Sequence, residues 1–198
     1  TLLPNRERLV LVAYWLSPIV IVATYGLGLN DIIPILFLAV AILCMRRLEM
    51  GFAGALCALA ISAKLSMIVA LPFIAIYLYH NRSLRQLIPS FVKGFAICGA
   101  VVFLPFLLTR AGPEMLASNP EIGKISAFSI ELGTSLSIYF VPLVYLVILY
   151  LAWRVRRINF ELFVASVGLA FLLIALMTPA TPGWFVWSVP FLVIYQAL

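Results

Sequence analysis

Long apolar runs occupy most of this chain, and short polar or basic clusters separate them. Of the 198 residues, 65% are hydrophobic and 10% are charged, whereas an average soluble domain has about 25% charged residues. The mean hydropathy is +1.18. A water-facing fold cannot bury this much apolar surface, so we expect lipid to be the solvent. The apolar runs cover residues 9–26, 32–45, 51–79, 94–109, 136–153, 160–177 and 184–198.

These runs predict an all-α fold, namely a polytopic integral membrane bundle of about seven or eight hydrophobic helices, some short or paired as hairpins. Residues 1–198 are expected to form a single transmembrane domain. Because the chain begins at Thr1 and ends inside an apolar run, we also expect a fragment of a longer membrane protein.

The block 51–79 is apolar except for Lys64 near its middle. At 29 residues it is long for one straight span and short for two. We expect two short helices that form a hairpin with Lys64 at or near the apex. One long tilted helix is the alternative.

The distribution of Lys and Arg favours the hairpin. With a cytoplasmic start and a hairpin, ten of the thirteen basic residues lie on the cytoplasmic side. A single helix would place "HNRSLR" opposite "MRRLEM" and weaken that bias. The same topology puts Asn30, Asp31, the loop 110–135 and the segment 177–190 at the outer face. Membrane topology thus explains the net charge of +6, and nucleic acid is not an expected partner.

Asn30 and Asp31 follow the segment "YGLG" and precede the second apolar run. Both residue types are preferred helix N-caps, and Pro34 is tolerated in a first helical turn. Capping does not require the two glycines, however, which would let the backbone approach a ligand closely. An ionisable group at membrane depth is also a candidate functional residue. Capping and function both remain open.

Lys64 costs a few kcal/mol in an apolar span unless it snorkels to the surface or meets an anion. The candidate anions are Asp31 and a ligand phosphate. Trp184 and Trp187 are three residues apart and would share one face of a helix start. They belong either to the interfacial aromatic belt or to a surface for a sugar ring or prenyl chain.

The loop 110–135 is long for a connection and is expected to contain a short interfacial helix. Arg110 either contacts a phosphate or only anchors a helix end. Glu114, Glu121 and Glu131 are expected to be solvated acids. The sequence contains no glycine-rich phosphate loop, nucleophile elbow or metal-ligand spacing.

Three segments resemble the polytopic GT-C glycosyltransferases: "LSPIVIVATYGLGLNDIIPILFLAVAILCMRR", "GFAGALCALAISAKLSMIVALPFI" and "TPGWFVWSVPFLV". More narrowly, they are similar to the bacterial mannosyltransferase-like branch that uses polyprenyl-phosphate sugars. The resemblance covers most of the chain, although its motifs are short and loose. The matching positions are Gly28, Asn30, Asp31, Arg46, Arg47, Gly51, Lys64, Pro72, Trp184, Trp187 and Pro190.

The resemblance implies transfer of a hexose such as mannose from a polyprenyl-phosphate donor to a glycan, lipid or protein acceptor. The site would face the periplasm from the bacterial inner membrane. Lys64 and Arg110 would contact the donor phosphate, and Asn30 and Asp31 would hold sugar or acceptor hydroxyls. The donor is the only cofactor-like group implied, and dependence on a divalent metal stays open.

In this family the catalytic acid usually lies in the first outer loop, and nothing before residue 30 resembles that loop. We therefore expect the principal base outside this chain, with Asp31 as a secondary acid. Two other functions stay open. A transporter or lipid-flippase-like protein would use similar short, broken helices. A non-catalytic membrane subunit would use Asn30 and Asp31 as caps and pair Lys64 with a partner helix.

Overall fold

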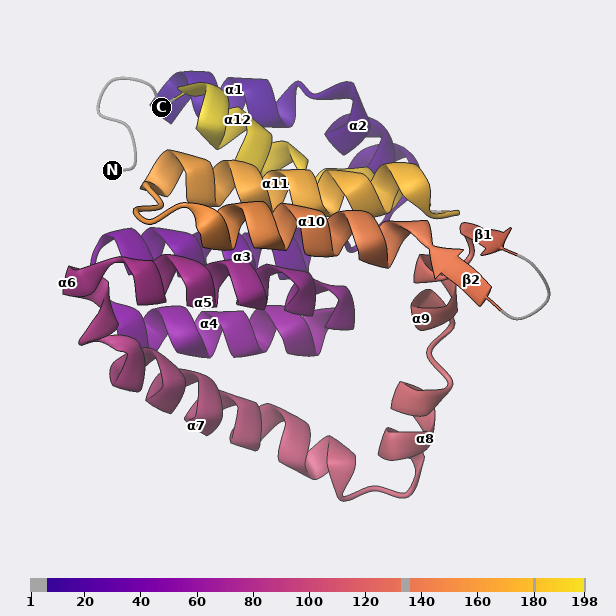
Figure 1. Ribbon diagram of the computed structural model, residues 1–198, viewed down its shortest axis with the longest axis horizontal. Coiled ribbons are helices and arrows are strands. Elements are labelled where there is room, and N and C mark those ends of the chain that lie inside the picture. The colour runs from indigo at the N-terminus through magenta and orange to yellow at the C-terminus, as the bar shows by residue number, and fades with distance from the viewer. Residues whose placement is uncertain (1–6, 133–135, 180, 198) are drawn as a thin grey trace.

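The computed structural model describes residues 7–132, 136–179 and 181–197, which are almost entirely helical (Figure 1). The first half holds α1 (Glu7–Trp15), α2 (Pro18–Val20), the π-helix η1 (Ile21–Gly26), α3 (Ile32–Arg46), α4 (Met50–Ala63), the 3₁₀ helix η2 (Leu65–Ala70), α5 (Leu71–His80) and α6 (Arg82–Arg85). The second half holds α7 (Ile88–Leu107), α8 (Ala111–Ala117), α9 (Pro120–Ile125), β1 (Ser129–Leu132), β2 (Leu136–Tyr139), α10 (Phe140–Arg154), α11 (Phe160–Met177), the 3₁₀ helix η3 (Pro182–Trp187) and α12 (Val189–Ala197). The expected all-α fold is confirmed.

Helix α11 lies at the centre of the bundle. It packs against α10, α12 and α5, while α3 packs against α4 and α4 against α7 (Figure 1). Helix α11 is strongly apolar, and many of its residues are buried against these neighbours, although Leu169 and Leu176 stay exposed. The largest fully buried side chains are aromatic and come mainly from α5, α11 and the C-terminal segment. They are Phe73, Phe163, Phe171, Trp187 and Phe191.

The block 51–79 forms the expected hairpin. Helix α4 ends at Ala63, Lys64 is extended with φ −156° and ψ 118°, and η2 and α5 lead back along the bundle (Figure 1). Lys64 therefore stands at the apex, and the alternative of one long helix is wrong.

Glycines bring α4 and α7 into backbone contact. A Cβ added at Gly54 would overlap the carbonyl oxygen of Phe91, and one added at Gly94 would overlap the carbonyl oxygen of Gly51. Only glycine, which has a hydrogen atom where other residues have a Cβ, permits two helices to approach so closely. The same close approach occurs between packed helices in membranes. This contact fixes the first half of α7, whereas its second half diverges from the bundle (Figure 1).

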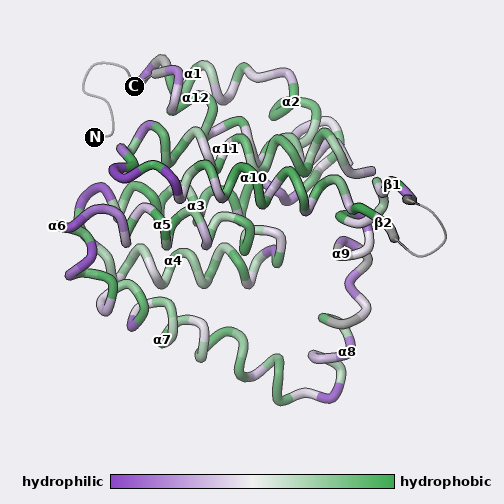
Figure 2. The backbone as a smooth tube through the Cα atoms, viewed as in Figure 1, coloured by the Kyte–Doolittle hydropathy of each residue, from purple (hydrophilic) through white to green (hydrophobic). Residues whose placement is uncertain are grey.

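The basic segments gather at one end of the bundle. His80 Nδ1 lies 2.9 Å from the Val155 carbonyl oxygen, so the α5–α6 turn contacts the α10–α11 link. The Arg46 guanidinium lies 5.0 Å from the ring centroid of Phe160, so the end of α3 reaches the same place. Figure 2 shows hydrophilic residues concentrated at α6 and the α10–α11 link, with others near α8 at the far end. Arg6, one of the ten predicted cytoplasmic residues, lies outside the described residues.

Two apolar runs differ from the expected single spans. In the run 9–26, α1 ends before Ser17, because the residue before Pro18 is disfavoured in helical conformation; α2 and the π-helix follow. In the run 136–153, the first four residues form β2, which pairs antiparallel with β1 in the register Ser129↔Tyr139. Helix α10 therefore begins only at Phe140. Residues 133–135 lie outside the described residues.

Two of the helices, α7 and α11, are long and apolar enough to cross a membrane by length and composition. They differ in their surroundings. Of the most apolar 18 residues in each helix, 6% are buried in α7 and 56% are buried in α11. Helices α3, α4 and α10 and the combined segment Leu65–His80 are apolar but shorter.

Candidate ion-cluster site

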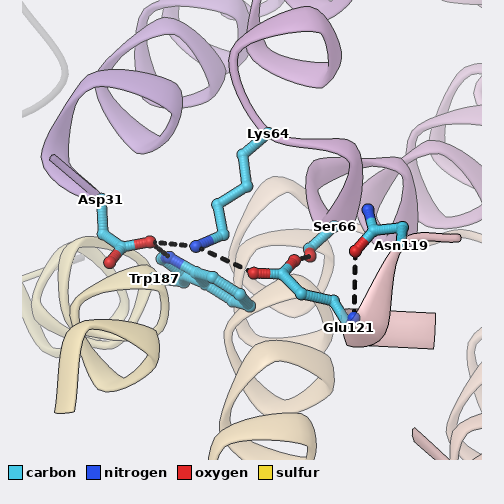
Figure 3. Close-up of polar contacts among 6 residues, drawn as sticks. All are labelled: Asp31, Lys64, Ser66, Asn119, Glu121 and Trp187. Carbon is cyan, nitrogen blue, oxygen red and sulfur yellow. Dashed lines mark hydrogen bonds and ion pairs between the residues drawn. The ribbon is translucent and has the colours of Figure 1, made fainter. Parts of the chain in front are cut away.

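Asp31 stands at the N-cap position of α3, but its carboxylate does not cap that helix. The residue has φ −62° and ψ −15°, and its side chain makes no capping hydrogen bond. The carboxylate turns into the protein, where Oδ1 accepts hydrogen bonds from Lys64 Nζ at 2.6 Å and Trp187 Nε1 at 3.0 Å (Figure 3). The Asp31 side chain therefore does not cap α3 by a hydrogen bond. It connects segments that are distant in the sequence.

Two glycines shape the surroundings of this carboxylate. Gly28 has φ +62°, a left-handed conformation that glycine adopts without steric cost, and it turns the chain between η1 and α3. Gly183 in η3 lies against the carboxylate, because a Cβ there would overlap Asp31 Oδ2. The segment "YGLG" predicted a close backbone approach at Gly26 and Gly28. In the structure a close approach to Asp31 is made by Gly183 instead.

Lys64 points its ammonium group between two carboxylates. Its amide donates to the Ala60 carbonyl oxygen and completes α4, while its extended backbone turns the side chain away from that helix. Nζ lies 2.6 Å from Asp31 Oδ1 and 3.4 Å from Glu121 Oε1. It also lies 4.8 Å from the ring centroid of Trp187. Of the two candidate anions for Lys64, Asp31 is therefore in contact with it.

Glu121 reaches the same cluster from α9. Asn119 caps that short helix, since its Oδ1 accepts a hydrogen bond from the Glu121 amide at 3.0 Å. Ser66 Oγ donates to Glu121 Oε2 at 2.8 Å, and the other carboxylate oxygen faces Lys64 (Figure 3). The expectation that Glu121 is a solvated acid is wrong, because both of its oxygens have protein partners.

The rings of Trp184 and Trp187 pack against the ammonium group of Lys64. In a 3₁₀ helix residues i and i+3 lie directly above one another, so the two rings of η3 stack at 4.9 Å and 23°. Both side chains are buried, which fits neither an exposed aromatic belt nor an open surface for a sugar ring or prenyl chain. Lys124 Nζ lies 5.2 Å from the ring centroid of Trp184, and Lys64 lies over Trp187.

The charges of the cluster balance, but the two acids differ in exposure. Asp31 and Glu121 offset Lys64 and Lys124, so the four side chains carry no net charge. The exposed side-chain fraction is 8% for Asp31, 21% for Lys64 and 26% for Glu121. Asp31 is therefore the internal acid and Glu121 the accessible one.

A cavity of about 640 Å³ opens beside Lys64 and Glu121. Its volume lies within the range of about 300–1,000 Å³ that is typical of ligand sites. Polar groups of Lys64, Asn119 and Glu121 line one side, and Phe103 and Phe106 of α7 line another. A smaller hollow of about 250 Å³ also includes Glu121. Asp31 lines neither space.

The structure brings four of the six predicted site residues together: Asp31, Lys64, Trp184 and Trp187. Asn30 and Arg110 are both exposed. Among the residues that the structure describes, the Asn30 side chain makes no hydrogen bond, and the Arg110 side chain makes neither a hydrogen bond nor an ion pair. Neither residue is therefore part of the cluster.

Sequence reasoning missed Glu121 and Ser66 as members of the cluster. Glu121 lies 57 residues from Lys64 in the chain, in a loop whose local pattern specifies only a helix start. The one available signal was that the loop and Lys64 were expected on the same side of the membrane. Within the described ranges, no group of three or more His, Cys, Asp and Glu side chains could hold a metal ion.

A scan of protein-family models and searches of curated proteins and solved structures found no match to this chain. The geometry and chemistry of the ion cluster therefore carry the functional argument.

Proposed function

We propose that this chain is a polytopic protein of the bacterial inner membrane, with its basic end in the cytoplasm and its ion cluster at the outer face. Helix α7 supports a lipid environment, because its apolar side chains are exposed along its length; Val101 is 70% exposed. The gathering of basic segments at one end supports the orientation. Helix α3 separates the two ends by about 22 Å, from its 15 residues at 1.5 Å each.

On this proposal the protein transfers a sugar from a polyprenyl-phosphate donor to an acceptor hydroxyl. One observation carries it: a lysine, an accessible carboxylate and apolar side chains of α7 line the same cavity. The polar side suits a sugar phosphate and an acceptor. The apolar wall suits the first part of a prenyl chain that continues into the bilayer.

Glu121 is the proposed general base, in place of the base that the sequence led us to expect outside this chain. It removes the proton of the acceptor hydroxyl while that oxygen bonds to the anomeric carbon of the sugar. The bond between the anomeric carbon and the phosphate oxygen breaks, and the polyprenyl phosphate leaves as an anion. Because this leaving group needs no proton, one carboxylate base is sufficient.

Lys64 is the proposed phosphate contact. An ammonium group has three N–H donors. Asp31 accepts from one and Glu121 lies near enough to orient a second, which leaves a third for a phosphate oxygen in the cavity. A fixed positive charge at that point would stabilise the charge that develops on the leaving phosphate.

Asp31 is a positioning residue in this proposal. Its oxygen holds Lys64 and Trp187 together, and it lies outside the cavity. Asp31 would thus fix the direction of the lysine without contacting the sugar. This role replaces the expected contact between Asp31 and substrate hydroxyls.

The test uses membranes that contain the protein, a polyprenyl-phosphate hexose labelled in the sugar, and a mixture of acceptors. The proposal expects label to leave the lipid in an acceptor-dependent manner, and expects Lys64→Met to abolish the release. Intact labelled lipid after incubation with folded protein and every acceptor class would contradict it.

A transporter or lipid flippase is the second candidate, and the break at Lys64 favours it. Discontinuous helices with a charged residue at the break commonly form transport sites. In sealed vesicles this function moves the labelled lipid to the other leaflet without cleaving it. The same labelled donor therefore separates the two functions by its chemical state at the end of the assay.

A further inference from the structure

A third hollow lies between α5 and α7. It has a volume of about 490 Å³, and apolar or aromatic side chains line it. They include Leu71, Ala75, Phe91, Phe95 and Trp153. This α5–α7 groove shares no lining residue with the cavity at Lys64. The α7 residues that line it, from Ile88 to Phe95, all lie in the first half of that helix.

One end of the groove has an aromatic and basic rim. Tyr79 and Trp153 line the groove there, stack at 5.8 Å and 16°, and are 45% and 51% exposed. The guanidinium carbon of Arg85 lies 4.4 Å from the ring centroid of Tyr79. Exposed aromatic rings of this kind mark the level of lipid headgroups.

Two arginines could supply positive charge for an anion: Arg85 at this rim, and Arg82 on the same short helix α6. Arg82 and Arg85 are exposed and three residues apart on α6, and neither forms an ion pair with an acid in the ranges that the structure describes. Arginine binds phosphate oxygens in a bidentate manner. A free phosphate would be satisfied by the arginines alone, but it would leave the adjoining apolar groove unexplained.

The apolar lining of the groove favours an acyl chain over a peptide as the occupant. An extended peptide would leave its backbone N–H and C=O groups unpaired against these apolar walls. An acyl chain has no such groups. From Leu71 to Tyr79 the groove follows α5 for about 12 Å at 1.5 Å per residue, which suits part of a lipid tail.

We propose that the α5–α7 groove binds one anionic phospholipid of the cytoplasmic leaflet, with an acyl chain between α5 and α7 and its phosphate at Arg82 and Arg85. The inference rests on the membrane placement proposed above. It does not depend on sugar transfer, so a protein that fails the transfer assay can still pass the lipid test.

The test measures lipid binding to the purified protein in a neutral detergent. Phosphatidylglycerol and phosphatidylcholine are added separately, and native mass spectrometry counts the bound lipids while thermal unfolding reports stabilisation. We expect one retained phosphatidylglycerol and a higher Tm, with weaker retention of phosphatidylcholine. The variant Arg82→Gln/Arg85→Gln should bind roughly fivefold more weakly for each arginine removed.

Two further variants test whether the lipid binds in the groove itself. Ala75→Trp fills the groove without removing a core side chain and should abolish retention. Arg110→Gln removes the same charge at the opposite end and should bind as the unmodified protein does. Equal retention of both lipids, full retention by Ala75→Trp, or an equal loss in Arg110→Gln would overturn the proposal. A dimer that forms through the groove and is lost in Ala75→Trp would also overturn it, by assigning the groove to a second copy.

Discussion

At the scale of single residues, the ion cluster couples three segments that are remote in the chain. The Asp31 side chain is 8% exposed, and among the described residues its carboxylate accepts hydrogen bonds from Lys64 and Trp187 alone. Removing one partner of a buried pair leaves the other charge without compensation, which costs more than the pair contributes when intact. Asp31 and Lys64 should therefore behave as one unit in mutagenesis.

Lys64→Met is expected to lower the free energy of unfolding by about 3 kcal/mol, because Asp31 keeps only the indole N–H. Asp31→Asn should also destabilise the protein, since the neutral amide loses most of its attraction for Lys64. In the double variant the loss should be smaller than the sum by about 1–2 kcal/mol. Thermal unfolding in detergent measures the three values.

Arg110→Met provides the control for this cycle. Arg110 is exposed, and its side chain makes no ion pair or hydrogen bond with any residue that the structure describes. Its replacement should therefore change the free energy of unfolding by no more than about 0.5 kcal/mol. Strictly additive losses for Asp31→Asn and Lys64→Met would mean that their 2.6 Å contact contributes nothing to folding.

At the scale of elements, the contact between α4 and α7 depends on glycine. Gly54 faces the backbone of Phe91 and Phe95, which cannot move without moving α7. Gly99, on the same helix α7, has only the Phe103 ring at 3.8 Å from an added Cβ, an ordinary packing distance. The two positions therefore form a matched pair for one substitution.

Gly54→Ala should destabilise the protein by about 1–3 kcal/mol, because the methyl group forces α4 and α7 apart. Gly99→Ala should be neutral or stabilising by up to about 1 kcal/mol, because alanine favours the helix. Thermal unfolding of both variants in one detergent provides the comparison. Equal effects at the two positions would contradict the close packing of α4 on α7.

The elements differ in how far the sequence could predict them. The hairpin at Lys64 was predictable from local composition. The length of the apolar block limits the helix lengths, and the positions of Lys and Arg indicate on which side of the membrane each connection lies. The strands β1 and β2 were not, because Leu136–Tyr139 continues into the apolar run of α10 without a polar break. The contact of Glu121 with Lys64 and Ser66 depends on tertiary packing, which no local periodicity reports.

At the scale of the whole molecule, the chain is polar at two ends and apolar between them (Figure 2). One end carries the basic segments, and the other carries the ion cluster and its cavity. Such a distribution suits a protein that crosses a bilayer, in which the two polar ends meet different aqueous compartments. The end with the ion cluster should therefore be accessible from outside the cell, and the basic end should not.

Single cysteines test this orientation. Ser118→Cys lies in the exposed connection after α8, and Ser83→Cys lies in the exposed helix α6. In a background where alanine replaces Cys44, Cys57 and Cys98, an impermeant maleimide should label Ser118→Cys in intact cells. It should label Ser83→Cys only after the inner membrane is opened. Labelling of both positions from the same side would contradict the orientation.

We propose that the carboxylate of Glu121, which lines the cavity, removes the proton of the acceptor hydroxyl. The most direct measurement is the initial rate of sugar transfer from a polyprenyl-phosphate hexose by Glu121→Gln and Glu114→Gln, side by side. Glutamine can still accept from Ser66, so Glu121→Gln should stay folded but lose about 10²- to 10⁴-fold in rate, the usual contribution of a general base. Glu114 is exposed in the same loop, and Glu114→Gln should keep the unmodified rate. Equal rates for the two variants would contradict the claim.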